Sequence, residues 1–264
     1  MATQVEAPAD PLVIGGVSLS SRLIHGTGKF TGNSVLAECL RQAEPSMITL
    51  AVRRLGLQGD GQSELADIDL SSFTLLPNTA GATTVDQAVR LARLGRAAGL
   101  SDFIKVEVIG DDETLLPDPG ATLEATKQLV ADGFTVLPYS SDDVVQAIRL
   151  EEAGAAAVMP LAAPIGTTMG VLNPTNIRLI IKKLGCPVIV DAGLGVPSDA
   201  ARCMEWGAAG VLVNTAIASA QDPPQMARAF AEAVVAGRRA HLAGRAEISL
   251  QALASSPTEG IPGT

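Results

Sequence analysis

Eight short apolar runs alternate with helical patterns along the chain, and this alternation constrains its fold most strongly. Apolar runs bounded by turn residues are typical of buried strands, and longer segments with a helical apolar period are typical of helices. The predicted strands are 21–26, 47–51, 73–76, 103–109, 135–138, 156–161, 187–191 and 210–214. The predicted helices are 33–44, 84–98, 121–132, 142–153, 174–184, 198–206 and 223–240. This order favours a parallel sheet, so we predict an α/β protein, a (β/α)8 TIM barrel.

We predict that the whole chain, 1–264, forms a single barrel domain. Residues 12–20 (LVIGGVSLS) indicate a small hairpin with a Gly-Gly turn, and 245–264 an irregular tail rich in Ser, Pro and Gly. The crossover at 53–70 is the weakest, because it has little helical periodicity. Candidate N-caps precede four of the helical patterns. They are Thr83, Ser141, Asn173 and Ser198.

An open, doubly wound sheet is the alternative fold. Its usual mark is a G-x-G-x-x-G motif after the first strand. Residues 26–32 read G-x-G-x-x-x-G instead, which is a weak match.

Charge and cysteine content exclude several classes of protein. The net charge is −9, from 19 basic and 28 acidic residues, and no basic patch indicates a nucleic-acid partner. Cys39, Cys186 and Cys203 are widely spaced, so neither a disulfide framework nor a zinc site is expected. Without a signal peptide or a membrane-spanning run, we expect a soluble cytoplasmic protein that binds no membrane.

The strand at 103–109 (FIKVEVI) carries two charged residues on one face. Because side chains alternate along a strand, Lys105 and Glu107 should both point into the barrel, about 6.6 Å apart. Lys and Glu are rarely buried unless they are paired. One interpretation is therefore a structural ion pair. The other is a Schiff-base lysine, whose desolvated amine is more readily neutral, with Glu107 moving protons.

A third charged residue, Asp191, ends the strand at 187–191, where barrel enzymes place active-site residues. It is a second acid–base candidate, or else a residue that caps or braces the following loop. Loops marked by Gly or Asn follow the last three strands, at 163–170, 192–195 and 214–218. Such loops bind phosphate at this end of many barrels, so a phosphorylated ligand is expected.

Neither histidine indicates a metal site. His25 ends the first strand, where it could line the cavity, and His241 lies near the end of the last helix. Neither has a carboxylate at ligand spacing, so we expect no metal and no other cofactor.

Five ordered motifs resemble those of the thiazole synthase family of thiamin biosynthesis, from about residue 12 to 257. The motifs are FIKVEVIGD at 103–111, LPNTAG at 76–81, MPL at 159–161 continuing to PIG at 164–166, VDAGLG at 190–195, and VNTAIA at 213–218. Five motifs in matching order are more specific than any one of them.

The resemblance implies a substrate, two partners and a set of roles. The substrate would be 1-deoxy-D-xylulose 5-phosphate, whose ketone forms an imine with Lys105, while Glu107 and Asp191 act as acid and base. Sulfur would come from the C-terminal thiocarboxylate of a small ubiquitin-like sulfur carrier protein, and dehydroglycine would supply the remaining ring atoms. The residues that contact the sugar phosphate would be Gly166, Ala192, Gly193, Asn214 and Thr215. A homo-oligomer is also expected, of a size that the sequence does not give.

The chain departs from the family pattern at two positions. The family usually reads Gly-Ser-Gly-Leu-Gly where this chain has 166–170 (GTTMG), so Thr168 replaces the middle glycine. The family often has Cys where this chain has Ala82, which argues against a thiol role there. Two other functions stay open: a Schiff-base aldolase or lyase acting on a sugar phosphate, and a phosphate-binding scaffold without catalysis.

Overall fold

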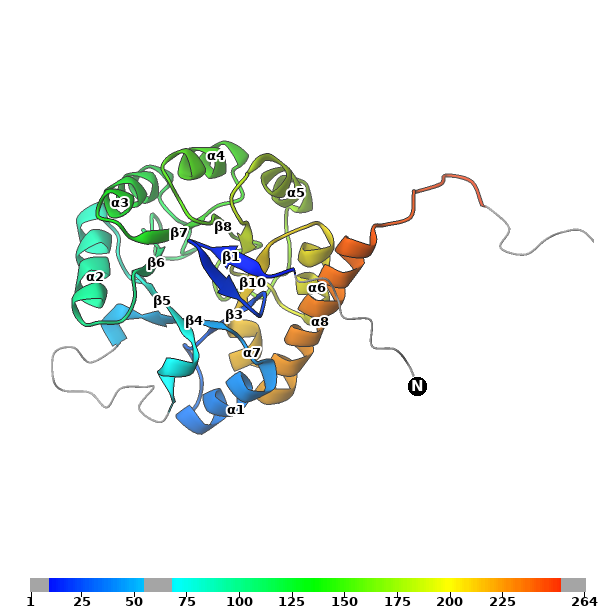
Figure 1. Ribbon diagram of the computed structural model, residues 1–264, viewed down its shortest axis with the longest axis horizontal. Coiled ribbons are helices and arrows are strands. Elements are labelled where there is room, and N and C mark those ends of the chain that lie inside the picture. The colour runs from blue at the N-terminus through cyan, green and yellow to red at the C-terminus, as the bar shows by residue number, and fades with distance from the viewer. Residues whose placement is uncertain (1–9, 55–67, 253–264) are drawn as a thin grey trace, which may run out of the picture.

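Eight parallel strands form the centre of the molecule, and helices surround them (Figure 1). The computed structural model describes residues 10–54 and 68–252. The barrel strands are β3 (Leu23–Gly26), β4 (Met47–Ala51), β5 (Thr74–Asn78), β6 (Phe103–Val106), β7 (Thr135–Ser140), β8 (Met159–Pro160), β9 (Ile189–Val190) and β10 (Gly210–Val213). The helices are α1 (Asn33–Ala43), α2 (Val85–Ala97), α3 (Pro119–Ala131), α4 (Val144–Glu152), α5 (Pro174–Lys183), α6 (Pro197–Glu205), α7 (Thr215–Ala218) and α8 (Pro223–Ala243).

The pairing of the strands confirms the barrel. Neighbours in the sheet follow the order β8-β7-β6-β5-β4-β3-β10-β9, and every pair is parallel. Parallel bridges from Val158 to Val188 and from Leu161 to Asp191 join β8 to β9 and close the ring. A closed ring excludes the doubly wound sheet. The predicted strand at 103–109 ends as a strand at Val106, but its side chains keep alternating beyond that point.

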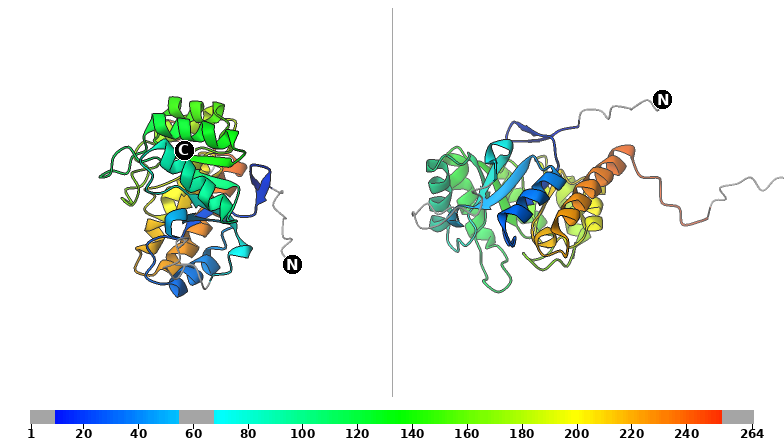
Figure 2. Two further views of the ribbon diagram at one scale, coloured as in Figure 1. Left: turned by 90° about the vertical axis from the view of Figure 1, so that its left-hand side faces the viewer. Right: turned by 90° about the horizontal axis from the view of Figure 1, so that it is seen from below.

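An antiparallel hairpin crosses one end of the barrel (Figure 2, right). Its strands, β1 (Leu12–Ile14) and β2 (Val17–Leu19), are joined by Gly15 and Gly16, both with positive φ. Hairpin residues pack on one inward side chain from each barrel strand, in a single apolar cluster. The strand members of that cluster are Ile24, Met47, Leu76, Phe103, Leu137, Met159, Ile189 and Leu212. The hairpin thus seals the amino ends of the strands.

The two segments for which the sequence predicts little regular structure are described only in part. Of the weak crossover at 53–70, residues 55–67 lie outside the described residues, and the flanks form the 3-10 turns η1 (Val52–Arg54) and η2 (Leu70–Ser72). Of the tail at 245–264, residues 245–252 contain no helix or strand, and 253–264 lie outside the described residues. Within the described parts of the chain, no helix has both the length and the apolarity needed to cross a bilayer.

Candidate active site

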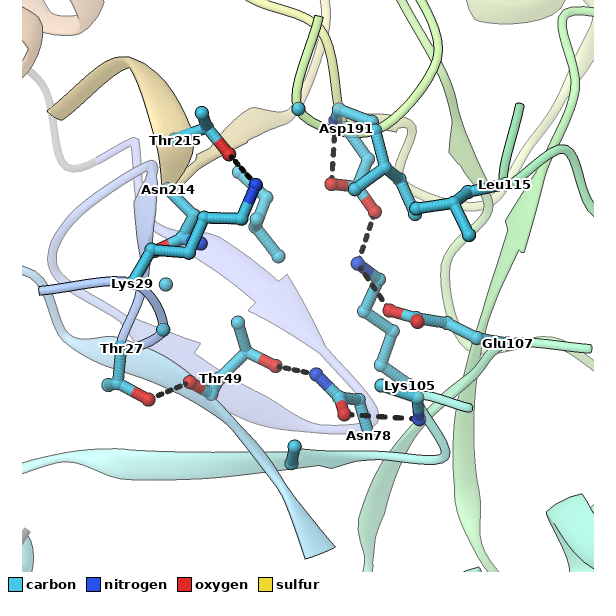
Figure 3. Close-up of a pocket in the computed structure, with 18 of the residues that line it drawn as sticks. Thr27, Lys29, Thr49, Asn78, Lys105, Glu107, Leu115, Asp191, Asn214 and Thr215 are labelled. Carbon is cyan, nitrogen blue, oxygen red and sulfur yellow. Dashed lines mark hydrogen bonds and ion pairs between the residues drawn. The ribbon is translucent and has the colours of Figure 1, made fainter. Parts of the chain in front are cut away.

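A cavity of about 340 Å³ opens at the carboxyl ends of the barrel strands, opposite the hairpin (Figure 3). All eight residues singled out from the sequence line it. They are Lys105, Glu107, Gly166, Asp191, Ala192, Gly193, Asn214 and Thr215. Parallel strands bring their carboxyl ends to one end of a barrel, which is why residues up to 110 positions apart in the sequence meet here.

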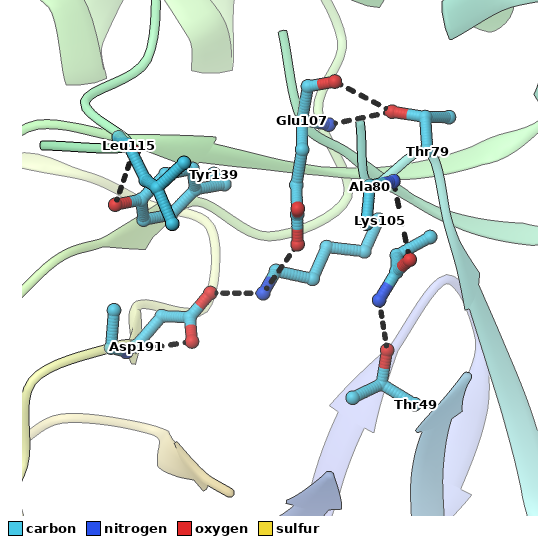
Figure 4. A network of polar contacts seen from close by, with 10 residues as sticks. Thr49, Thr79, Ala80, Lys105, Glu107, Leu115, Tyr139 and Asp191 are labelled. Atoms are coloured by element: carbon cyan, nitrogen blue, oxygen red, sulfur yellow. Dashed lines mark hydrogen bonds and ion pairs between the residues drawn. The ribbon is translucent and has the colours of Figure 1, made fainter. Parts of the chain in front are cut away.

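Lys105, Glu107 and Asp191 form one buried charged group (Figure 4). The Lys105 Nζ lies 3.0 Å from Glu107 Oε1 and 2.5 Å from Asp191 Oδ2. The exposed fractions of the three residues are 4%, 6% and 1%, in chain order. On the other face of this segment, Ile104, Val106 and Val108 pack under α2 and α3. The alternation predicted for 103–109 is therefore confirmed.

Hydrogen bonds from neighbouring residues fix the backbone of Glu107 and the carboxylate of Asp191. Thr79, just after β5, accepts a bond from the Glu107 N–H and donates one to the Glu107 carbonyl, each 2.8 Å long. Asp191 Oδ1 accepts the N–H of Ala192 at 2.7 Å, so this carboxylate also braces the loop after β9. Asp191 therefore braces the following loop, as one interpretation of the sequence predicts, and it also contacts Lys105.

Burial and the neighbouring carboxylates have opposite effects on the pKa of Lys105. Burial lowers the pKa of Lys105, but the charges of Asp191 and Glu107 together outweigh burial and raise that pKa above its ordinary value. The two carboxylates therefore favour the ammonium, whereas burial, on which the sequence interpretation rested, favours the neutral amine. Burial, followed by the charges of Asp191 and Glu107, raises the pKa of Tyr139, whose ring lies 5.4 Å from the Lys105 Nζ.

The loops after β8 and β9 contain several residues in the left-handed region. Gly166 and Gly193 have φ of 82° and 73°, and Thr168 and Ala192 have φ of 51° and 47°. A Cβ at Gly193 would collide with the backbone of Ala163, so only glycine allows these two loops to approach each other. Thr168 keeps the positive φ at the position where the family usually has glycine.

Sequence reasoning missed several residues that line the cavity, including Lys29, Thr49, Arg53 and Asn78. Lys29 belongs to the glycine-rich segment 26–32, which we compared only with a dinucleotide fingerprint. The available signal was its place directly after the first strand, where its loop reaches the same end of the barrel as Lys105.

His25 does not line the cavity. Ile24 points into the barrel, so His25 points outward, where it stacks on Phe30 with ring centroids 5.8 Å apart. Its side chain is fully buried, and burial lowers the pKa of His25 to about 4. Across residues 10–54 and 68–252, no three His, Cys, Asp or Glu side chains are grouped so as to hold a metal ion.

A closed barrel with a buried lysine and two carboxylates at the carboxyl ends of its strands has the architecture of a TIM-barrel enzyme. The family model described as thiazole biosynthesis protein ThiG matches residues 13–257. The chain therefore belongs to the thiazole synthase family, whose members are enzymes of thiamin biosynthesis.

Individual relatives agree with this assignment. Thiazole synthase of Bacillus subtilis is 54% identical over 252 residues, which cover 95% of this chain and 98% of that protein. Thiazole synthase of Staphylococcus saprophyticus is 54% identical over 249 residues, with 94% and 98% covered. Among solved structures, the Amycolatopsis orientalis BexX/CysO complex gives a TM-score of 0.82 at 32% identity, with 92% of this chain and 100% of that chain covered.

Proposed function

We propose that this protein makes the thiazole phosphate carboxylate precursor of thiamin through a Schiff base on Lys105. The substrates are 1-deoxy-D-xylulose 5-phosphate, dehydroglycine and the sulfur of a carrier-protein thiocarboxylate, which makes the enzyme a sulfur-transferring transferase. The observation that carries the proposal is a buried lysine with a carboxylate on either side, inside a cavity at the carboxyl end of the barrel.

The first step is proton transfer within the charged group. Because Lys105 is an ammonium, one proton passes to Glu107 or Asp191 before the nitrogen lone pair attacks the ketone carbon. Attack leaves two protons on the nitrogen, and one of them passes to the oxygen to give the neutral carbinolamine. The carbinolamine hydroxyl then takes the proton of the carboxylic acid and leaves as water, and the last nitrogen proton passes to the carboxylate so formed, which gives the neutral imine. Later steps move the carbonyl along the sugar by enolisation, for which the same carboxylates donate and accept protons in turn.

The phosphate of the sugar occupies the end of the cavity formed by Gly166, Ala192, Gly193, Asn214 and Thr215. Positive φ at Gly166, Ala192 and Gly193 shapes these loops around a concave surface. Within the described parts of the chain, the N–H groups of Gly166 and Gly193 donate to no other protein atom, so they are free for an anion.

The sulfur donor is a small ubiquitin-like carrier protein. The relative BexX forms a complex with a second protein, CysO, which supports a protein partner for this chain. Assembly into a homo-oligomer is also part of the proposal, and light scattering on the purified protein would measure it.

Reduction with borohydride tests the imine. Incubation with 1-deoxy-D-xylulose 5-phosphate and borohydride should give a stable adduct that peptide mapping locates at Lys105, because only an imine is reduced to a stable amine. Lys105→Ala should give none, nor should Lys105→Arg, since a guanidinium keeps the charge but forms no imine. An adduct at Lys29, Lys127, Lys182 or Lys183 would contradict the assignment.

Capture of the sulfur carrier separates this function from that of an aldolase with the same lysine. A small carrier protein ending in Gly-Gly should be retained by the immobilised protein, and its thiocarboxylate form should supply sulfur to the product. Formation of the adduct without any carrier binding or sulfur transfer would favour the aldolase.

A further inference from the structure

Lys29 lies in the loop after β3, and its backbone is strained. Its φ is 70°, in the left-handed region that residues with a side chain rarely adopt. Gly28 precedes it in the same loop, yet the lysine takes the unfavourable conformation. Such strain persists where the surrounding structure holds it, and it is concentrated at functional sites.

The strained backbone carries the Lys29 ammonium to the end of the cavity where we place the phosphate. Its Nζ lies 3.5 Å from the Thr215 hydroxyl oxygen, and a Cβ on Gly166 would be only 3.0 Å from it. The ammonium therefore lies between the loop that follows β8 and the first residue of α7. Figure 3 shows Lys29 beside Thr215 on one side of the cavity and Lys105 on the other.

The charges around the two lysines differ. Lys105 has two carboxylates within 3.0 Å, whereas within the described residues no carboxylate lies within 4.0 Å of the Lys29 Nζ. The protein contact of Lys29 at this end is a neutral hydroxyl. A cation held beside free backbone N–H groups without an anionic neighbour is suited to an anionic ligand.

We propose that Lys29 binds the substrate phosphate and sets the preference for a phosphorylated over an unphosphorylated sugar. The inference rests on the proposed function, in which Lys105 reacts with the ketone at the other end of the same sugar. Lys29 supplies a full positive charge, and the loop glycines supply backbone N–H groups. Its contribution is therefore expected in substrate binding, with no part in forming the imine.

The test compares Lys29→Met with Lys29→Arg and with Lys127→Met, a matched change at an exposed lysine on α3. Calorimetry with inorganic phosphate should show binding weakened by about 10- to 100-fold in Lys29→Met, the size expected for a hydrogen bond to a charged group. The dissociation constants of Lys29→Arg and Lys127→Met for phosphate should differ from that of the wild type by no more than about 3-fold. Thermal melting of each variant checks that the fold is kept.

Borohydride trapping gives the specificity. Lys29→Met should need correspondingly more 1-deoxy-D-xylulose 5-phosphate for half-maximal adduct, while its yield with unphosphorylated 1-deoxy-D-xylulose stays at the wild-type level. An equal loss with both sugars, unchanged phosphate binding, or a wild type that binds no phosphate overturns the proposal. If Lys29→Met weakens phosphate binding but the wild type traps neither sugar, the assignment of Lys29 stands and the Schiff-base function fails.

Discussion

Lys105 shares its charge with two carboxylates, and this arrangement gives each of the three residues a double role. The carboxylates stabilise the buried ammonium, which would otherwise be costly to remove from water. They are also the nearest bases for its proton, at 3.0 Å and 2.5 Å from the Nζ. The stability of the site and its chemistry therefore depend on the same contacts. Substitutions that keep the shape of a side chain but remove its charge distinguish the two roles.

We expect Glu107→Gln and Asp191→Asn each to keep the borohydride-trapped adduct while turnover falls by about 10²–10⁴-fold. Each change removes one of the two charges that raise the pKa of Lys105, so a neutral amine forms more easily. Proton transfer in the later steps is lost, because an amide is neither acid nor base. Two measurements check this prediction: single-turnover product formation gives the loss of turnover, and the amount of trapped adduct shows that the imine still forms.

Two results would show that these carboxylates have structural roles and no catalytic ones. Turnover near the wild-type level in Asp191→Asn would leave Asp191 as a brace for the Ala192 N–H. Failure of Glu107→Gln to fold would favour the interpretation of Lys105 and Glu107 as a structural ion pair.

His25 should make the fold sensitive to mild acid. Its pKa falls from 6.5 to about 4 in the folded state, so between these values the unfolded chain binds a proton that the folded chain does not. The free energy of unfolding should therefore decrease as pH falls from 6.5 to about 4, by up to about 3 kcal/mol. Urea unfolding at a series of pH values measures this dependence.

The matched variant for this prediction is His25→Leu, which replaces the ring with a non-titrating apolar side chain. The difference in unfolding free energy between wild type and His25→Leu should change across the same pH window and be constant above pH 6.5. A difference that does not vary with pH would show that His25 does not titrate on unfolding.

At the residue scale, the sequence predicts which way a side chain points better than it predicts which groups surround that side chain. Alternation along 103–109 places Lys105 and Glu107 inside, because that depends only on neighbouring residues. The pKa of Lys105 also depends on Asp191, which lies 86 positions later in the sequence. No pattern among neighbouring residues indicates that these two side chains meet. Lys29 was missed for a related reason, since its direction comes from a positive φ that a non-glycine residue rarely takes.

At the element scale, the first residues of the helices show how accurately capping residues in the sequence predict where a helix begins. Asn173 is the N-cap of α5, as predicted, and its side chain accepts from the Asn176 N–H. The predictions for the starts of α2 and α4 are wrong by one and two residues, since the caps are Thr84 and Asp143. The prediction of Ser198 is also wrong. There α6 begins at Pro197, because the Asp199 carboxylate accepts the N–H groups that precede the helix.

In the loop from Gly166 to Gly170, Thr168 has a positive φ at the position of the middle glycine of the family pattern. Thr168 is β-branched and exposed, yet its φ is 51°, which is unfavourable for such a side chain. Its carbonyl oxygen packs directly against Gly195 of the neighbouring loop. Packing between the two loops therefore imposes a conformation that the threonine does not favour.

We expect Thr168→Gly to raise the free energy of unfolding by about 1 kcal/mol, because glycine removes the strain of a left-handed backbone. Thr167→Gly is the control at the adjacent exposed position, which has no positive φ and whose hydroxyl donates to the Pro164 carbonyl at 2.8 Å. That change should destabilise by about 0.5–1 kcal/mol or more. Urea unfolding compares the two, and destabilisation in both would show that Thr168 is not strained.

At the scale of the whole molecule, the two ends of the barrel serve different purposes. The hairpin and the inward side chains near the amino ends of the strands form one apolar cluster. The charged group and the loops that carry Gly166, Thr168, Ala192 and Gly193 lie at the carboxyl ends. The sequence predicts this division from the order of strands and loops alone, because it follows from the topology of a parallel barrel. The contact of Gly15 with Thr135, the first residue of β7, depends on tertiary packing and was not predictable.

This division predicts that Ile14→Ala lowers stability without changing the chemistry. Ile14 is fully buried in the hairpin cluster, so its truncation should cost about 2–5 kcal/mol of unfolding free energy. Val13, its neighbour in β1, is 46% exposed, so Val13→Ala should change stability by no more than about 0.5 kcal/mol. Well below the melting temperature, both variants should give the wild-type yield of borohydride adduct, since no residue of the hairpin lines the cavity. Urea unfolding and adduct yield are measured on the same preparations. A loss of adduct in folded Ile14→Ala would show that packing at the amino ends of the strands controls the position of Lys105, and the two ends would then not be independent.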